Sequence, residues 1–558
     1  MNKIEIKYGE KVRTVDSYST VEDALRAHGL IKETNKLEYA QNLIVGALIN
    51  GEAYPLKKRI SASASIEPIH VFDMLGRRIY RHSLCFLLSL ASSICFPDRL
   101  LIIGHSLGDG YYFSFEDDGP IEEEDVEKIR EKMKEIVSSS ISIDYVSISG
   151  DDAIRVFKNL KRPNTELLLS SRNDSLLHLY RIGGYSQVSY EPLVQNTSIL
   201  SVWELRKYSE KGLLLRYPTS TNINTIAPLR DNPLLFNVFK EYKDWGRILG
   251  VRSVGEMNRL SITGGIGEYI KLSEDLHRRK IASIADSIAT KGAKVVFVAG
   301  PSSSGKTTFA KRLCEQLKLL GFEPFKLSLD DYYNPPWDAP KDEDGKPDLE
   351  ALEALNLELI DKNMMDLVCG ESVNLPSYDF NTHITTFSPV PVKMGERTII
   401  VVEGIHALNS KITGAIDSKY VFRVYISALT QLNLDDSNRV STSDNRLLRR
   451  IIRDHRSRGM SAERTLLMWP SVTRGETKHI FPHQNNADVM FNSALDYEIA
   501  VLSPYVQPLL RSVKSEEGEA YTLSRRLLAF LENVYPVSSV YVPSDSLLRE
   551  FIGQSDYE

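Results

Sequence analysis

The chain has 558 residues, of which 42% are apolar and 25% are charged, and its formal net charge at pH 7 is −6. Such a composition is typical of a globular protein with several domains, and the small acidic excess argues against non-specific binding to nucleic acid or to a membrane. The four cysteines form no CxxC pair and no apolar run is long enough to span a bilayer, so the sequence predicts a soluble, cytoplasmic protein with reduced thiols.

Two α+β modules are expected in the first 220 residues. In the first, residues 1–65, we predict a strand, a capped helix start and a strand that enters an Asn-Gly turn, at residues 3–8, 19–25 and 43–52. In the second, residues 66–220, we predict an amphipathic helix and two strands, at residues 125–138, 143–148 and 165–169. Residues 221–290 follow as a connector that ends in a long helix over residues 270–290.

Residues 291–525 carry the clearest chemistry, and residues 526–558 are predicted to form a C-terminal tail that packs at the periphery or moves. A short apolar run at residues 295–299 predicts a buried parallel strand. It is followed by GPSSSGKT at residues 300–307, which matches the phosphate-loop pattern G-x-x-x-x-G-K-[ST] in full, and by an amphipathic helix over residues 309–319. Strand, loop and helix come in the order that a nucleoside triphosphate site requires.

Each residue type in this loop has a physical role in binding ATP together with Mg²⁺. The two glycines let the backbone curl so that its N–H groups point at phosphate oxygens, and the following helix adds its positive dipole end. Lys306 supplies a cation for the β- and γ-phosphates, and Thr307 supplies a hydroxyl for Mg²⁺. The predicted phosphate-binding residues are Gly300, Ser302, Ser303, Ser304, Gly305, Lys306, Thr307 and Thr308.

Two further predicted strands end in carboxylates. The apolar run at residues 398–402 ends in Glu403, which can hold Mg²⁺ together with Thr307. The strand at residues 325–329 ends in Asp330 and Asp331. Because parallel strands put their carboxyl ends at the ligand crevice, either aspartate can take the proton of an acceptor hydroxyl.

Aromatic and basic residues follow farther along the chain. Tyr378 and His383 can stack on a planar base or hydrogen-bond to it, although such a segment by itself is typical of a surface turn. Six arginines fall within thirteen residues, and four of them share one helical face. We expect them to neutralise a triphosphate from a closing lid; they are Arg446, Arg449, Arg450, Arg453, Arg456 and Arg458.

At these residues the chain resembles the uridine kinase branch of the phosphoribulokinase/uridine kinase family, over about residues 291–510. The resemblance rests on residues 300–308, 327–333, 376–383, 402–405, 449–459 and 487–489. It implies an α/β P-loop kinase domain with a parallel sheet, and a phosphotransferase with an alcohol acceptor (EC 2.7.1 class). The catalytic residues that it implies are Asp330, as the base, and Lys306.

The resemblance also implies the roles of other residues. Phosphates would contact Arg453 and Arg458, and the nucleoside would contact Tyr333, Asp348, Tyr378, His383 and Arg450. Asp348 is the weaker match, because the spacing around it differs from the family pattern. Met460 and Met468 stand where the family usually has an arginine and a glutamine, so the preferred base is not predicted.

The first half resembles a TGS domain (residues 1–65) followed by the editing-type second domain of threonyl-tRNA synthetases (residues 66–220). The match rests on residues 81–83 and 108–113 and on the helix at residues 121–137. Of the four editing-site positions that the resemblance implies, only His82 keeps its residue; the others are Phe86, Ser189 and Leu193. One ligand of four cannot hold zinc or run the editing reaction. The resemblance therefore implies a fold kept for binding, regulation or assembly.

Three functions stay open at this point. The first is a nucleoside kinase that uses ATP and Mg²⁺ to make a nucleoside 5′-monophosphate. The second is a kinase of another small alcohol, against which Tyr378 and His383 argue. The third is an RNA- or tRNA-associated regulatory NTPase, which the lack of basic excess disfavours and the TGS-like start favours. We also expect a homo-oligomer. The choice between pyrimidine and purine nucleosides, the choice between ATP and GTP, and the role of residues 1–220 are not predicted.

Overall fold

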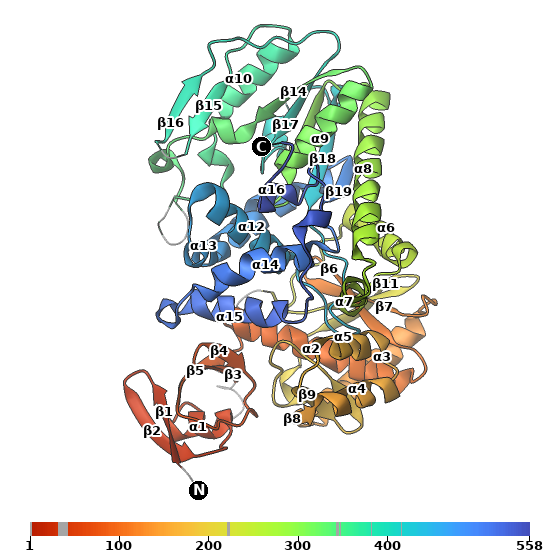
Figure 1. The fold of residues 1–558 in the computed structure, drawn as a ribbon, viewed down its shortest axis with the longest axis vertical. Coiled ribbons are helices and arrows are strands. Elements are labelled where there is room, and N and C mark those ends of the chain that lie inside the picture. The colour runs from red at the N-terminus through yellow and green to blue at the C-terminus, as the bar shows by residue number, and fades with distance from the viewer. Residues whose placement is uncertain are drawn as a thin grey trace.

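The computed structural model describes residues 3–31, 43–219, 222, 224–341, 345, 347–380, 382–414 and 416–557. The predicted boundary at residues 220 and 221 lies outside these ranges. In Figure 1 the first module (red) lies at one end of the molecule with the second module (orange to yellow) beside it. A parallel sheet lies at the opposite end, and the blue helices of the C-terminal third lie between. Within the described ranges, no helix combines the length and the apolar character needed to cross a membrane.

In its described residues the first module has one helix, α1 (Val21–Ala27), and a five-stranded mixed sheet. The strands are β1 (Lys3–Tyr8), β2 (Lys11–Asp16), β3 (Ile44–Ile49), β4 (Glu52–Tyr54) and β5 (Ala64–His70), in the order β2-β1-β5-β3-β4. The predicted strand at residues 3–8 is confirmed, and a reciprocal cap between Thr20 and Asp23 starts α1 as predicted. Strand β5 runs past residue 65, where the sequence predicts the end of this module.

The second module has a long buried helix, α2 (Met74–Cys95), and two antiparallel sheets. One sheet has the order β11-β12-β7-β6, with β6 (Leu101–Leu107), β7 (Gly110–Phe115), β11 (Glu204–Ser209) and β12 (Gly212–Arg216). The other has the order β10-β9-β8, with β8 (Asp144–Ser149), β9 (Leu176–Ile182) and β10 (Tyr185–Gln187). The remaining helices are α3 (Glu123–Ser138), α4 (Gly150–Asn159) and α5 (Pro163–Arg172).

Helix α5 corrects one prediction, since the segment at residues 165–169 is helical and not a strand. Pro163 lies at the start of the helix, where its missing N–H costs nothing. The Asp436 carboxylate, from the third part of the chain, accepts hydrogen bonds from the Thr165 N–H at 2.9 Å and from the Asn164 side chain at 2.8 Å. The helix start is therefore stabilised by a residue 271 positions away, which a local pattern cannot reveal. The predicted helix at residues 125–138 and strand at residues 143–148 are confirmed.

The connector consists of three helices that lead to a five-stranded parallel sheet. They are α6 (Pro233–Leu249), α7 (Val254–Thr263) and α8 (Ile266–Lys291). The sheet has the order β14-β17-β13-β18-β19, with β13 (Val295–Ala299), β14 (Glu323–Ser328), β17 (Thr398–Glu403), β18 (Val421–Ser427) and β19 (Val489–Asn492). A hairpin of β15 (Pro376–Asp379) and β16 (Ile384–Phe387) stands apart from it.

Both faces of the parallel sheet are covered, which explains the uninterrupted apolar run of β13. Val296 and Val298 pack with α8 and with α9 (Lys306–Leu319) on one face. Val295 and Phe297 pack with α6 and α10 (Leu357–Val368) on the other face. Alternate residues of a strand point to opposite faces, so a strand buried on both faces needs apolar residues at every position.

The C-terminal third adds helices below the carboxyl ends of the strands. They are α11 (Ser410–Thr413), α12 (Thr442–Arg458), α13 (Ala462–Gly475), α14 (Glu498–Arg511), α15 (Glu519–Leu531) and α16 (Arg549–Ile552). The predicted boundary at residue 525 falls inside α15. Residues 526–557 do not form a peripheral tail, since Leu547, Leu548 and Phe551 are fully buried. These side chains complete the apolar core around α9, α12 and α14.

Candidate active site

The phosphate loop joins β13 to α9. A Cβ atom on Gly300 would lie 2.1 Å from the carbonyl oxygen of Ile426, so no larger residue fits there. Gly305 has a φ of 81°, in the left-handed region that favours glycine. Because α9 begins at Lys306, its unpaired N–H groups and its positive dipole end directly follow the loop. The backbone therefore has the form of an anion-binding site.

Lys306 lies between this loop and the strand-end carboxylates. Its ammonium group donates to the carbonyl oxygen of Pro301 at 3.2 Å. Burial lowers the pKa of Lys306, while the negative charges of Glu403, Asp330 and Glu550 raise it. Lys306 therefore lies close enough to Glu403 and Asp330, the two carboxylates that the sequence singled out, to interact with their charges.

The structure brings Thr307 and Glu403 into contact. Thr307 Oγ1 donates to Glu403 Oε1 at 2.8 Å, because β13 and β17 are adjacent parallel strands with Val298 opposite Glu403. Lys326 on β14 pairs with the other Glu403 oxygen at 3.0 Å. The sequence did not single out Lys326, because a lysine in a strand carries no local signal of its partner.

Thr307 and Glu403 fit Mg²⁺ that is bound together with a nucleotide. Such an ion takes most of its ligands from phosphate oxygens and water, and only one or two from the protein. A hydroxyl and a carboxylate 2.8 Å apart supply that number. Among the described residues, no group of three or more His, Cys, Asp or Glu side chains is placed to hold a metal ion by itself.

The neighbours Asp330 and Asp331 have different surroundings. Asp330 is exposed to solvent, but the protein atoms crowded around its carboxyl and the charge of Glu403 raise its pKa, while Lys306 lowers it. Asp331 accepts a hydrogen bond from the Tyr378 N–H at 3.4 Å. Asp331 therefore faces the hairpin of β15 and β16, and Asp330 is the aspartate that interacts with Lys306.

An aromatic cluster lies beside these aspartates. The Tyr378 hydroxyl and His383 Nδ1 are 3.1 Å apart, and the ring of Tyr333 lies 6.2 Å from that of Tyr378 between centroids. Phe380 and Trp337 extend the cluster, with ring centroids 5.0 Å from Tyr378 and 6.0 Å from His383 respectively. The sequence singled out Tyr333, Tyr378 and His383; the structure adds Phe380 from the hairpin and Trp337 from the segment that follows β14.

Two acidic residues, Asp348 and Glu350, lie near Tyr333, whose hydroxyl donates to the carbonyl oxygen of Leu349 at 3.0 Å. Asp348 Oδ2 lies 3.3 Å from Nε2 of His479. Burial and the charge of Glu476 raise the pKa of Glu350 to about 7, while the charges of Arg450 and Lys306 lower it. Sequence reasoning missed Glu350, whose proximity to Lys306 and Asp330 is shown only by the structure.

We expect Glu350→Gln to stabilise the protein at alkaline pH. The folded state raises the pKa of Glu350 from 4.5 to about 7, so the wild type loses stability as pH rises through this window and regains none above it. Glutamine does not ionise. The free energy of unfolding of Glu350→Gln, relative to that of the wild type, should therefore increase by about 1–3 kcal/mol between about pH 5 and pH 8. The lower part of this range allows for the partial exposure of the Glu350 side chain. Urea unfolding at both pH values measures it, and an equal gain at both would contradict the assignment.

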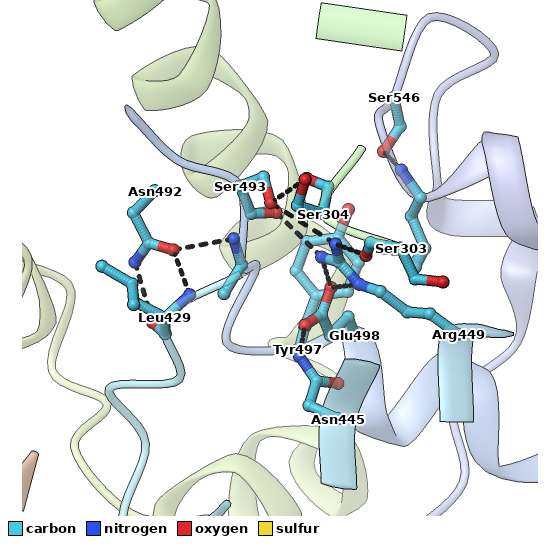
Figure 2. Close-up of polar contacts among 12 residues, drawn as sticks. Ser303, Ser304, Leu429, Asn445, Arg449, Asn492, Ser493, Tyr497, Glu498 and Ser546 are labelled. Carbon is cyan, nitrogen blue, oxygen red and sulfur yellow. Dashed lines mark hydrogen bonds and ion pairs between the residues drawn. The ribbon is translucent and has the colours of Figure 1, made fainter. Parts of the chain in front are cut away.

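Two arginines of α12 hold the phosphate loop through its carbonyl oxygens. Arg446 Nε donates to the Ser302 carbonyl at 2.9 Å. Arg449, which is fully buried, donates to the carbonyl oxygens of Ser303 at 3.3 Å and Ser493 at 2.9 Å and pairs with Glu498. Figure 2 shows this guanidinium placed between Glu498 and the loop serines. These two arginines are structural supports of the loop, and the predicted lid role does not describe them.

Three of the other four arginines of α12 surround one buried carboxylate. Asp454 pairs with Arg450 at 3.2 Å, Arg453 at 3.2 Å and Arg458 at 3.4 Å. Arg450 also donates to Ser302 Oγ at 2.8 Å, which places it on the loop. Three guanidinium groups around one carboxylate leave a positive surplus beside the phosphate loop, as a polyanion site needs. The predicted contacts of Arg453 and Arg458 with phosphates, and of Arg450 with the nucleoside, stay predictions.

Glu476 is a further site residue that the sequence did not single out. Its Oε1 accepts a hydrogen bond from the Ser302 N–H at 2.9 Å and pairs with Arg446. It fixes the loop from the segment that follows α13. Its role depends on a contact 174 residues away in sequence, so no local motif reveals it.

The four editing-site positions of the second module hold no catalytic arrangement. Phe86 and Leu193 are buried in its apolar core. Ser189 Oγ donates to the Glu191 carbonyl at 2.7 Å. Burial lowers the pKa of His82 to about 3, so this imidazole is neutral near pH 7. The expectation of a retired editing site agrees with this geometry and stays a prediction.

An ion cluster beside His82 joins the second module to the helices of the C-terminal third. Arg78 pairs with Glu191 at 2.6 Å and with Asp444, in the first turn of α12, at 3.4 Å. Arg526 on α15 pairs with Asp444 through two hydrogen bonds of 2.7 and 2.8 Å. The helix that supports the phosphate loop is therefore also held by the second module.

Comparison with known families gives a match for one part of the chain. Residues 295–500 match the model of the Phosphoribulokinase / Uridine kinase family. This range contains the phosphate loop, both strand-end carboxylates, the aromatic hairpin and the arginine helix. The fold expected from the motifs, a P-loop kinase domain with a parallel sheet, is confirmed.

Curated relatives match the other part of the chain, since the N-terminal half is similar to threonine–tRNA ligases. The enzyme of Desulforamulus reducens is 26% identical over 242 residues, 40% of this chain and 38% of that protein. The enzyme of Lawsonia intracellularis is 29% identical over 176 residues, 31% of this chain and 27% of that protein. The chain thus spans well under half the length of these relatives.

Two solved structures are similar at low scores. The "Possible Uridine Kinase" from Bacillus stearothermophilus has a TM-score of 0.27 and 18% identity, over 38% of this chain and 98% of that one. The YGR205w protein has a TM-score of 0.25 and 14% identity, over 36% of this chain and 85% of that one. At these scores neither structure supports an argument about this chain.

Proposed function

We propose that the chain, through its phosphoribulokinase/uridine kinase family domain at residues 295–500, is an ATP-dependent nucleoside kinase. It transfers the γ-phosphate of ATP to the 5′-hydroxyl of a nucleoside. One observation carries the proposal: the phosphate loop with Lys306, the Thr307–Glu403 pair and Asp330 meet at the carboxyl ends of adjacent parallel strands, with a cluster of aromatic rings beside them.

The donor would bind with its phosphates against the loop and the start of α9. The amide N–H groups after Gly305 and the ammonium group of Lys306 neutralise the phosphates. Thr307 and Glu403 would hold Mg²⁺, which neutralises the charge that develops on the transferred group. The surplus positive charge of the α12 arginines adds to this field.

Asp330 would act as the base. It accepts the proton of the nucleoside 5′-hydroxyl, whose oxygen forms a bond to the γ-phosphorus while the bond from that phosphorus to the β,γ-bridging oxygen breaks and ADP leaves. The raised pKa of Asp330 makes its carboxylate a stronger base than a solvated aspartate. Lys306 keeps the proton-free form populated, because its positive charge opposes the raising of that pKa.

The aromatic cluster would position the base of the nucleoside. A planar base can stack on Tyr378 or Tyr333 and exchange hydrogen bonds with the hydroxyl of Tyr378 or with His383. Asp348 and Arg450 would contact the sugar. These rings favour a nucleoside over a non-aromatic alcohol as the acceptor.

A panel of nucleosides with ATP and Mg²⁺, scored for nucleoside 5′-monophosphate by chromatography, tests the proposal. We expect at least one nucleoside to be phosphorylated with stoichiometric release of ADP. ATP hydrolysis without any nucleoside monophosphate would overturn it.

The similarity to threonine–tRNA ligases favours a second candidate, an RNA-associated NTPase. In that case the first half would grip tRNA and the phosphate loop would act as a switch. A gel-shift assay of the full chain with tRNA, with and without ATP, distinguishes the two: a shift that depends on ATP, together with no nucleoside phosphorylation, favours the switch.

A further inference from the structure

The C-terminal segment, residues 543–557, is built onto the helix that follows the phosphate loop. Asp545 pairs with Arg278 at 2.7 Å and with Arg312 of α9 at 3.7 Å. Leu547 is fully buried against the core of α9, and its Cδ2 lies 3.1 Å from where a Cβ of Gly305 would be. The Tyr557 hydroxyl donates to Glu315 of α9 at 2.6 Å. The segment is thus an integral part of the structure around α9 and the end of the phosphate loop.

Within this segment, the side chain of Glu550 reaches the start of α9. Its Oε2 accepts hydrogen bonds from Thr308 Oγ1 at 2.8 Å and from the Thr308 N–H at 3.3 Å. Arg456 of α12 donates to the main-chain oxygen of Glu550 at 3.0 Å and so fixes the backbone that carries this side chain. The charge of Glu550 also acts on Lys306, whose pKa it raises.

These contacts use donors that a nucleotide needs. The N–H of Thr308 lies in the first turn of α9, where amides have no hydrogen-bond partner within the helix itself. The amides of such a loop and helix start cradle the phosphates of a nucleoside triphosphate. A carboxylate oxygen and a phosphate oxygen cannot accept the same hydrogen bond, and two anions this close repel each other.

We propose that Glu550 is an internal competitor of the donor nucleotide, which occupies part of the phosphate site and weakens nucleotide binding. This inference rests on the proposed binding of ATP to the phosphate loop. When the nucleotide binds, the Glu550 side chain turns away from Thr308 while the buried residues on either side of it, Leu547 and Phe551, keep the segment in place. The C-terminal segment thereby sets the nucleotide concentration at which the site fills.

Equilibrium binding of the fluorescent nucleotide mant-ATP to the purified full-length chain tests the competition. We expect Glu550→Gln, which keeps the shape of the side chain and removes its charge, to lower the Kd for mant-ATP about tenfold. Glu532→Gln, at an exposed glutamate after α15, is the matched control and should leave the Kd unchanged. Adenosine, which carries no phosphate, should bind the wild type and Glu550→Gln equally.

The outcomes separate this inference from the proposed function. Binding of mant-ATP to the wild type with an equal or higher Kd for Glu550→Gln overturns the competition and leaves the kinase proposal standing. A gain for adenosine equal to that for mant-ATP also overturns it, because the charge would then not be the cause. Absence of mant-ATP binding to the wild type, Glu550→Gln and Glu550→Ala alike, in samples that melt cooperatively, overturns both proposals.

Discussion

Replacing Asp330 with asparagine is expected to lower kcat for nucleoside phosphorylation by about 10²–10⁴-fold, the usual contribution of a positioned base. Asparagine keeps the size of the side chain but cannot accept the proton of the 5′-hydroxyl. Since Asp330 lies at the end of β14, outside the phosphate loop, the Kd for mant-ATP should change by less than about threefold. Initial rates of monophosphate formation and a binding titration on the same preparation measure both quantities.

Asp331→Asn is the matched control for this variant, because it makes the same chemical change at the neighbouring position. Asp331 faces the Tyr378 N–H, so its loss should act on the KM for the nucleoside and leave kcat within about tenfold of the wild type. A large loss of kcat in Asp331→Asn, with little loss in Asp330→Asn, would transfer the role of base to the second aspartate.

Replacing Lys306 with alanine is expected to reduce kcat/KM for ATP by about 10³-fold or more. The variant removes the mobile cation of the phosphate loop, whose positive charge acts on Asp330, Glu403 and Glu550. A steady-state ATP titration at saturating nucleoside measures the loss. Lys318→Ala, at an exposed lysine in the last turn of α9, is the control and should behave as the wild type. Activity of Lys306→Ala within about tenfold of the wild type would show that the loop does not hold the reacting phosphates.

The parts of the site that the sequence predicted are those with a local pattern. Three adjacent patterns each predict one local structure: the apolar run of β13, the glycines and lysine of the loop, and the amphipathic start of α9. The structure has the strand, the loop and the helix in that order. The end of β17 could also be located, since a strand buried on both faces needs an unbroken apolar run that stops at the first polar residue.

The parts that the sequence did not predict depend on contacts between distant residues. Arg446 and Arg449 have the spacing of a charged lid, yet they are buried under the loop, because Glu476 and Glu498 supply partners from other helices. Helix α5 was predicted as a strand, because the carboxylate that caps it comes from Asp436. Residues 526–557 were expected at the periphery, because Pro536, Pro543 and many serines interrupt their apolar residues.

The fused N-terminal half has a physical link to the kinase domain in the cluster of Arg78, Glu191, Asp444 and Arg526. Removing one member of a buried ion pair leaves its partner uncompensated. The second module thus contributes to the position of α12, whose arginines support the phosphate loop. Through this link the N-terminal half supports α12 without any need for an editing reaction.

We propose that the phosphate loop directs the terminal phosphorus of ATP toward a hydroxyl activated by Asp330. The label of [γ-³²P]ATP, followed during a single turnover with an accepted nucleoside, reports this transfer. We expect the label to appear in the nucleoside 5′-monophosphate with the wild type and to stay in ATP with Asp330→Asn. Label that appears only in inorganic phosphate, or in the monophosphate at equal rates with both proteins, would contradict it.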